Sequence, residues 1–133
     1  MAEKLRLKVV TPTRVVVDAL VDEVQLPGML GVLGILPGHA PLVASLSIGE
    51  LMYRHGLRES YLAIQWGFAE VGPDAVTVLA EVAERPEEID VQAAQEARRR
   101  AEEALRLASG EEFAHHKTVL EAAVTRLKVA ARR

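Results

Sequence analysis

The feature of this sequence that most constrains its fold is a change in the spacing of apolar residues near Pro86. Before that proline, apolar and polar residues alternate in short runs, which is typical of strands with one buried and one solvated face. After it come long runs rich in alanine, arginine, glutamate and leucine, which are strong helix formers. The sequence therefore predicts a β-domain over residues 1–84 and a helical domain over residues 85–133.

Several short strands are expected in the first domain, separated by turn residues. The clearest is the segment in which Leu5, Leu7 and Val9 point to one face while lysine and arginine alternate with them. Because no helical segment interrupts the strands, they favour an antiparallel β-sandwich or barrel. The other expected strands are 15–17, 19–26, 50–54, 60–66, 68–71 and 76–82.

Two helices joined by a short break are expected in the second domain. Asp90 is suited to cap the first helix, Val91–Ala108, because its carboxylate can accept hydrogen bonds from free N–H groups. Ser109-Gly110 ends that helix, and the second runs over Glu111–Arg132. So short a connection predicts an antiparallel hairpin. The whole chain is therefore predicted to be an α+β protein, an N-terminal antiparallel β-sandwich followed by a C-terminal antiparallel α-helical hairpin.

The inner surface of this hairpin is predicted to be mostly alanine. Alanine permits close approach but buries little apolar area, since each buried CH₂ contributes only about 0.8 kcal/mol. We therefore expect the hairpin to detach or extend more easily than the β-domain unfolds. The inner alanines are Ala94, Ala97, Ala101, Ala104 and Ala108. The expected apolar stripe of the second helix is Phe113, Leu120, Val124, Leu127 and Ala131.

The composition argues against several classes of function. The chain has no cysteine, which removes disulfide scaffolds, thiolate zinc sites and cysteine nucleophiles. Its net charge of −3 argues against a nucleic-acid partner. Arg98–Arg100 are followed by Glu102 and Glu103, which indicates a solvated helix face. The longest apolar stretch, Met29–Leu36, is far shorter than a spanning helix, so no direct membrane insertion is expected.

No residue pattern predicts an active site, and we expect neither a metal nor a required cofactor. His39 lies in a Gly/Pro loop and His55 in a turn, without partners at a metal-ligand spacing. A hydrogen-bonded or interface role is the favoured interpretation for His39. Two alternatives come from other classes: a small β-barrel metal enzyme that uses His39 and His55, and a free-standing adaptor with a helical interaction arm.

The segment Pro27–Leu36 is apolar yet rich in turn residues. Turn-rich segments are usually exposed loops, so an apolar one suggests a protein interface. A buried bend between strands explains the same pattern equally well, and both interpretations stay open at this point.

Five short runs resemble the epsilon subunit of bacterial F-type ATP synthases. They are Val10-Thr11-Pro12, Gly34-Ile35-Leu36-Pro37-Gly38-His39-Ala40-Pro41-Leu42-Val43, Gly67–Val71, Val76–Ala80 and Ile89-Asp90, in the family's order and spacing. The resemblance implies a non-catalytic rotor subunit of the central stalk, which couples the catalytic head to the c ring during proton-driven ATP synthesis. It implies a sandwich bound to the gamma subunit and the c ring, on the cytoplasmic face of the plasma membrane. It also implies that the hairpin lies folded or extends into the alpha/beta head, where it inhibits ATP hydrolysis.

The resemblance also suggests which residues face the rotor. In many family members the loop before the Gly34 run carries acidic residues that face the c ring. Here Leu30 and Val32 occupy those positions, so an apolar contact is expected. Trp66 replaces the first of two paired glycines and is expected to fill space at a subunit contact. The rotor-interface candidates are Met29, Leu30, Val32, His39 and Trp66.

Some bacterial members of the family bind ATP through an Ile/Leu-Asp-x-x-Arg-Ala motif. Here Ala93 stands in place of the arginine, and Ala122 stands where a second, later arginine would be. Because a charge-assisted hydrogen bond contributes about 1.5–3 kcal/mol, we expect ATP binding to be weak or absent. The residues that do match the nucleotide site are Glu84, Asp90, Arg100 and Arg126.

Basic residues gather at the end of the second helix, where the helix dipole favours them. We hypothesise that they also meet acidic loops of the catalytic beta subunits when the hairpin extends. These residues are Arg126, Lys128, Arg132 and Arg133.

Overall fold

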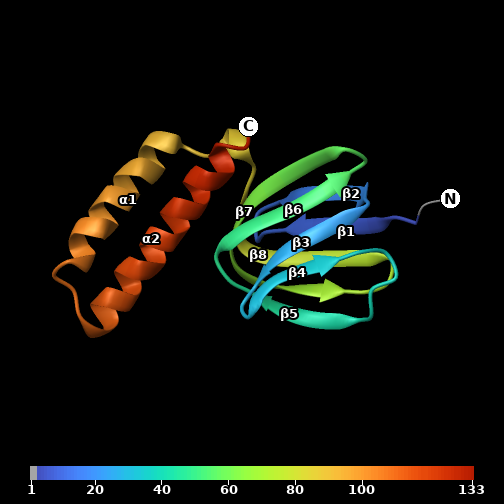
Figure 1. Ribbon diagram of the computed structural model, residues 1–133, viewed down its shortest axis with the longest axis horizontal. Coiled ribbons are helices and arrows are strands. Elements are labelled where there is room, and N and C mark those ends of the chain that lie inside the picture. The colour runs from blue at the N-terminus through green and yellow to red at the C-terminus, as the bar shows by residue number, and fades with distance from the viewer. Residues whose placement is uncertain (1–2) are drawn as a thin grey trace. The chain divides into compact units, whose positions relative to one another are not determined.

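The computed structural model describes residues 3–133, which fall into two compact units that divide between Glu84 and Arg85 (Figure 1). The first unit is a β-sandwich and the second is a pair of helices. The strands are β1 (Leu5–Val10), β2 (Val15–Val21), β3 (Glu23–Gly28), β4 (Gly31–Ile35), β5 (Leu42–Leu46), β6 (Gly49–His55), β7 (Arg58–Val71) and β8 (Ala75–Glu84). The helices are the 3₁₀ turn η1 (Pro86–Glu88), α1 (Val91–Leu105) and α2 (Gly110–Ala130).

The strands form one mixed sheet that closes into a sandwich. Its hydrogen-bonded order is β2-β1-β8-β7-β5-β3-β4, and β6 pairs with β3 and β7. The pairs are antiparallel except for β1 with β8, which run parallel with Leu7 opposite Val76 and Val9 opposite Val78. The expected sandwich and helical hairpin are confirmed. The single parallel pair joins segments far apart in the chain, so local alternation gave no sign of it.

Aliphatic side chains fill the interior of the sandwich. The alternation in β1 holds as expected, because Leu5, Leu7 and Val9 are fully buried while the residues between them face solvent. Burying one such side chain stabilises a fold by about 1.5–3 kcal/mol, so this cluster is the main source of stability in a domain with few aromatics. Its other large members are Val21, Val24, Leu26, Ile35, Leu46, Leu51, Leu62, Ile64 and Val76.

The strand predictions need three corrections. The strands β4 and β5 were not expected, because glycines interrupt the first and small residues the second. The expected strand 19–26 is broken at Asp22, where the chain turns from β2 into β3. The segments 60–66 and 68–71 belong to one strand of 14 residues, β7, since the distortion at Trp66 does not end the ladder.

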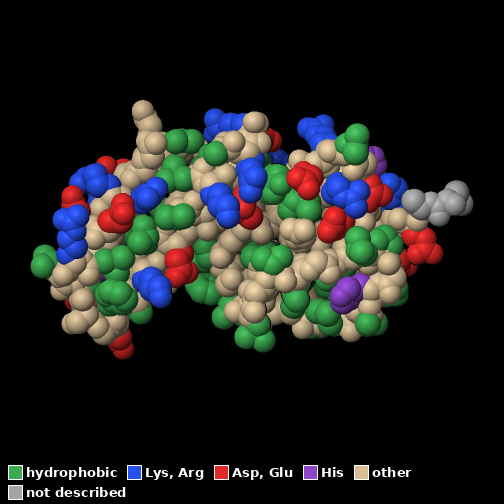
Figure 2. All heavy atoms as spheres, in the orientation of Figure 1, with side chains coloured by type: hydrophobic (Ala, Val, Ile, Leu, Met, Phe, Trp, Pro, Cys, Tyr) green, Lys and Arg blue, Asp and Glu red, His purple; other side chains and the backbone are tan. Residues whose placement is uncertain are grey.

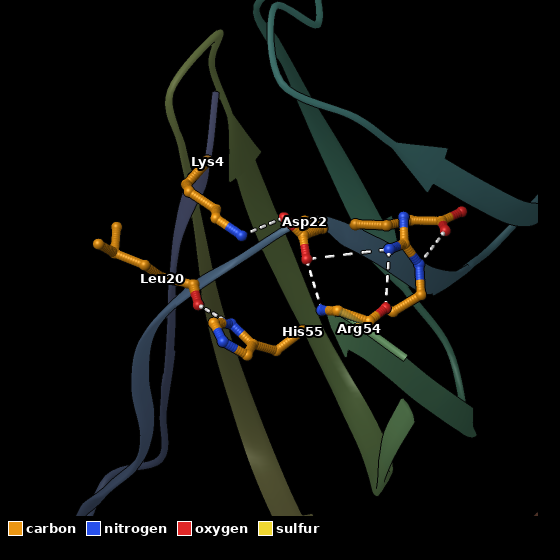
Figure 3. Close-up of polar contacts among 7 residues, drawn as sticks. Lys4, Leu20, Asp22, Arg54 and His55 are labelled. Carbon is orange, nitrogen blue, oxygen red and sulfur yellow. Dashed lines mark hydrogen bonds and ion pairs between the residues drawn. The ribbon is translucent and has the colours of Figure 1, made fainter. Parts of the chain in front are cut away.

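A cluster of hydrogen bonds and ion pairs surrounds Asp22, where the chain turns from β2 into β3 (Figure 3). The carboxylate of Asp22 accepts hydrogen bonds from the Lys4 ammonium and from the backbone N–H of Gly56. The guanidinium of Arg54 lies 3.8 Å from the same carboxylate and 3.3 Å from that of Glu23. The hydrogen bond from Lys4, followed by the one from Gly56, holds the pKa of Asp22 below its ordinary value.

The helical unit is an antiparallel hairpin whose first helix starts as expected. The Oδ1 atom of Asp90 accepts a hydrogen bond of 3.0 Å from the Ala93 N–H, which caps α1. Along α1, i,i+4 ion pairs join Glu96 to Arg100, Arg98 to Glu102 and Arg99 to Glu103. Figure 2 shows basic and acidic side chains interspersed over this helix. Neither helix in the described part of the chain has the length and apolar composition needed to cross a membrane.

The buried residues of the hairpin are mostly alanine. In α1 the buried residues are Ala94 and Ala101, and in α2 they include Ala123 and Ala130; both pairs are seven positions apart and so lie on one face of their helix. The expected stripe of α2 is wrong at Phe113, Val124 and Ala131, which are exposed. The buried residues of α2 are Ala123, Val129 and Ala130, so small residues take most of the buried positions and a large apolar residue takes one.

We predict that Asp22→Asn lowers the urea midpoint of unfolding at neutral pH. Because the pKa of Asp22 is lower in the folded chain than in the unfolded one, its carboxylate stabilises the fold above the unfolded pKa. That stabilisation is lost as the pH falls through the lowered folded value. The midpoints of wild type and variant should therefore differ most near neutral pH and converge in strong acid.

The matched control for this prediction is Asp18→Asn. Asp18 is more exposed in its ion pair with Arg6, so its replacement should change the urea midpoint less. A difference between Asp22→Asn and wild type that stays constant with pH would contradict the role given to the carboxylate charge.

Candidate functional site

The two-residue turn Met29-Leu30 joins β3 to β4 and projects apolar side chains into solvent. At its base Gly28 pairs with Gly31, whose φ is +131°. A Cβ atom on Gly28 would come within 2.7 Å of the Gly31 carbonyl oxygen, so the glycines make this tight turn possible. The Leu30 side chain is fully exposed and Met29 is 57% exposed. The Pro27–Leu36 segment is therefore a strand hairpin with an exposed apolar tip.

This hairpin tip forms one wall of a groove of about 780 Å³, which we call the apolar groove. The strand β5 and the Trp66-Gly67 segment form the other walls. Figure 2 shows hydrophobic side chains along this edge of the sandwich, over β4 and β5. The described residues that line the groove include no Asp, Glu, Lys, Arg or His. They are residues 28–33, 42–46, 66 and 67.

Trp66 lines the apolar groove with a strained backbone. Its φ is +52°, a region that costs a non-glycine residue about 1–2 kcal/mol. The next residue, Gly67, packs directly on β8, because a Cβ atom there would lie 2.0 Å from the Leu79 carbonyl oxygen. Strain of this kind persists where the surrounding structure over-determines it, and it concentrates at functional positions. The strained backbone of Trp66 therefore makes the groove a candidate functional site.

Exposed apolar side chains stand on β5, where Val43 lines the apolar groove, and on the outer face of β7 and β8. Val43 is 72% exposed, Phe68 49% and Leu79 42%, and Phe68 pairs with Leu79 across the two strands. None of these three residues was predicted from the sequence as a site residue. A signal existed for Phe68 and Leu79, because they are apolar and alternate with the buried Ala69 and Val78. A strand that is apolar on both faces is usually covered on both faces.

The two candidate histidines lie apart from the apolar groove. The Nδ1 atom of His39 is 2.7 Å from the Ala40 carbonyl oxygen, and His39 does not line the groove. The Nδ1 atom of His55 is 3.3 Å from the Leu20 carbonyl oxygen (Figure 3). Within residues 3–133 no group of three or more His, Cys, Asp or Glu side chains is placed to hold a metal ion.

Two of the residues matched to a nucleotide site are engaged in other contacts. The Asp90 carboxylate caps α1, and the Arg100 Nε atom lies 3.0 Å from Glu96 Oε1. Glu96 also lies 2.6 Å from Arg99, and the hydrogen bond from Arg99, with a smaller contribution from Arg100, lowers the pKa of Glu96. Glu96 is thus an anion at neutral pH, and a polyphosphate would have to displace it from Arg100.

The remaining candidates are distributed over both units. Glu84 is half-buried at the end of β8, and Arg126 is half-buried on α2. Lys128 lies exposed on the last turn of α2, and Arg132 and Arg133 are exposed just beyond it. The cationic end of α2 expected from the sequence is therefore present on the surface.

The fold is that of a two-domain protein, a small β-sandwich with an exposed apolar groove followed by a helical hairpin whose buried residues are mostly alanine. The family model of the ATP synthase delta/epsilon chain β-sandwich domain matches residues 4–86. The model of the delta/epsilon chain long α-helix domain matches residues 87–131. The chain therefore belongs to the delta/epsilon chain family of ATP synthase, and the resemblance found in the sequence is confirmed. Members of this family are accessory, non-catalytic subunits of the complex.

Individual relatives agree with this assignment over most of the chain. The ATP synthase epsilon chain of Koribacter versatilis (strain Ellin345) is 55% identical over 111 residues, which cover 84% of this chain and 78% of the relative. That of Geotalea uraniireducens (strain Rf4) is 48% identical over 134 residues, which cover 99% and 97%.

Two solved structures share the fold. A chain of the Euglena gracilis mitochondrial ATP synthase superimposes with a TM-score of 0.83 and 22% identity, covering 96% of this chain and 81% of that one. A chain of the Tetrahymena thermophila enzyme gives a TM-score of 0.59 and 14% identity, covering 98% and 96%.

We predict that Trp66→Gly leaves the isolated protein more stable than Trp66→Ala by about 1 kcal/mol. Both variants lose the indole ring, but only alanine keeps the Cβ atom that disfavours the positive φ at this position. Urea unfolding of the two variants measures the difference directly. Equal stability of the two variants would show that the backbone at residue 66 carries no strain.

Proposed function

We propose that this chain is a rotor subunit of the central stalk of a bacterial F-type ATP synthase. Its β-sandwich binds the gamma subunit and the c ring, and so helps to couple the catalytic head to the ring during proton-driven ATP synthesis. Its helical hairpin inhibits ATP hydrolysis when it extends into the alpha/beta head. The chain is peripheral and lies on the cytoplasmic face of the plasma membrane.

The observation that carries this proposal is the apolar surface of the sandwich. Leu30 is fully exposed and Val32 is 74% exposed, and they stand beside an uncharged groove. Apolar surface gathered in one area, rather than scattered singly, marks an interaction site. Burying one such side chain at an interface contributes about 1.5–3 kcal/mol. A covering partner would therefore be held mainly by apolar contacts.

The choice of rotor partners is supported by the structural neighbours. The Euglena chain comes from a structure of OSCP, F1 and the c-ring. The Tetrahymena chain comes from a structure of the central stalk and c-ring. We assign the hairpin tip at Met29-Leu30 and Val32 to the c ring. We assign Trp66 and the outer face at Phe68 and Leu79 to the gamma subunit.

The hairpin has features that suit a regulatory arm. Its buried residues are mostly alanine, so the separation of α1 from α2 exposes little apolar area. Basic residues stand at the C-terminal end of α2, where Lys128 and Arg132 are exposed to solvent. Acidic loops of the catalytic beta subunits are the partners that this charge would favour.

ATP binding at the hairpin is proposed to be weak or absent. Ala93 and Ala122 supply no charge where the nucleotide-binding relatives have arginine, and Arg100 is already paired with Glu96. The Glu96 carboxylate thus occupies the place at Arg100 that a phosphate group of ATP would take. The inhibitory switch is therefore proposed to respond to the state of the rotor more than to ATP.

Replacing Leu30 or Val32 with Asp should weaken binding to an assembled gamma–c-ring rotor by roughly tenfold or more, because each change removes apolar contact and adds a charge that must be desolvated. Affinity is measured on immobilised rotor, and thermal unfolding should be unchanged because both side chains are exposed.

The matched control for the rotor experiment is Leu57→Asp. Leu57 is also fully exposed, but it lies at the β6–β7 turn and does not line the apolar groove. This variant should bind like wild type. Rotor affinity that is the same for Leu30→Asp, Val32→Asp and wild type would reject the proposed contact.

Isothermal titration of the isolated chain with ATP should give no binding in the micromolar range. A variant with Ala93→Arg, Ala122→Arg and Glu96→Gln should gain affinity, because it restores two cations and releases Arg100 from its internal partner. Micromolar affinity in the wild-type chain would contradict this part of the proposal.

A further inference from the structure

Arg133 connects the end of the helical unit to its beginning. Its Nε atom donates a hydrogen bond of 3.0 Å to the Pro86 carbonyl oxygen, and its Nη2 atom donates one of 2.9 Å to the Ile89 carbonyl oxygen. Pro86 opens η1, and Ile89 directly follows it. One guanidinium therefore binds two carbonyls of the segment through which the chain enters the hairpin.

Buried apolar residues surround this junction. Ile89 is 3% exposed and Val129 is fully buried, and α2 packs against η1. The backbone N–H of Arg133 donates to the Ala130 carbonyl oxygen at 3.4 Å, which continues the helical winding past the end of α2. Arg133 is thus held in place by a well-packed helix end.

The two ends of the hairpin are closed by different means. At one end α1 and α2 are joined covalently through residues 106–109. At the other end they have no covalent connection, and there Arg133 bonds across to residues 86 and 89. A guanidinium is suited to this contact, because its planar fork can serve two acceptors at once. Any movement that takes the end of α2 away from η1 must break both hydrogen bonds.

We propose that Arg133 is a latch that holds the hairpin closed by binding the carbonyls of Pro86 and Ile89. The proposal rests on the function inferred above, in which the hairpin opens to inhibit hydrolysis. In the closed hairpin the guanidinium of Arg133 is bound to the carbonyl oxygens of Pro86 and Ile89. On opening, the guanidinium leaves both carbonyls and becomes available to an acidic surface. The same residue thus opposes extension and then contributes to the extended state.

Distance measurement by electron paramagnetic resonance on the full isolated chain tests the latch. The sequence has no cysteine, so nitroxide labels on Gln95→Cys and Glu121→Cys would be unique, and both positions are exposed. Wild type should give mainly one short distance between α1 and α2. Arg133→Ala should raise the fraction of longer distances by roughly three- to tenfold, because two charge-assisted hydrogen bonds are lost.

Two further variants separate the latch from a general effect of charge. Arg133→Lys keeps the charge but lacks the planar fork, so its open fraction should lie between those of wild type and Arg133→Ala. Arg106→Ala removes a cation at the covalently closed end of the hairpin and should give the wild-type distances. A wild-type distance distribution in Arg133→Ala overturns the latch. The catalytic head is absent from this measurement, so its result is independent of whether the hairpin inhibits hydrolysis.

Discussion

The pairing of β8 with both β1 and β7 is the interaction on which the rest of the sandwich depends. The strand β8 runs parallel to β1 and antiparallel to β7, and so it joins the β1–β2 pair to the remaining strands. Val76 and Val78 carry the inner face of β8 into the core and are fully buried. Without β8, β1 and β2 would be a two-stranded ribbon, which is at best marginally stable in water. Everything that the outer face of β7 and β8 presents to a partner is positioned by this central strand.

The same strand alternation that builds the core also places apolar side chains on the outer face of the sandwich. Phe68 and Leu79 stand on the face opposite to the buried residues, and their exposure leaves apolar area uncovered in the isolated chain. The apolar groove, the glycine-dependent hairpin tip and the positive φ of Trp66 lie on or beside this surface. The fold accounts for the glycines of the tight turn, and a covering partner would account for the exposed apolar side chains. The helical unit differs from the sandwich, since its buried residues are mostly alanine and the separation of its helices would expose little apolar area.

Local patterns in the sequence predicted the two-part architecture, the alternation in β1 and the cap at Asp90. They could not predict β4, because glycine hides its alternation, or the parallel β1–β8 pair, because that contact is remote in the chain. The buried face of α2 was misjudged at Val124, since large apolar residues were weighed above small ones. At the candidate site, Met29, Leu30, Val32 and Trp66 line the apolar groove, whereas His39 does not. Phe68 and Leu79 were missed because their strands were read for one buried face only, and Val43 was missed because β5 was not expected as a strand.

We propose that the sandwich attaches this chain to the rotor and that the hairpin regulates the catalytic head. This division of roles is tested most directly by ATP hydrolysis in complexes assembled with the full chain or with a chain that lacks residues 88–133. The sandwich is a compact unit of its own, so the shortened chain should still join the complex in full amount, and hydrolysis should rise. Unchanged hydrolysis in a complex that has bound the shortened chain would contradict the regulatory role. Failure of the shortened chain to assemble would contradict the division between attachment and regulation.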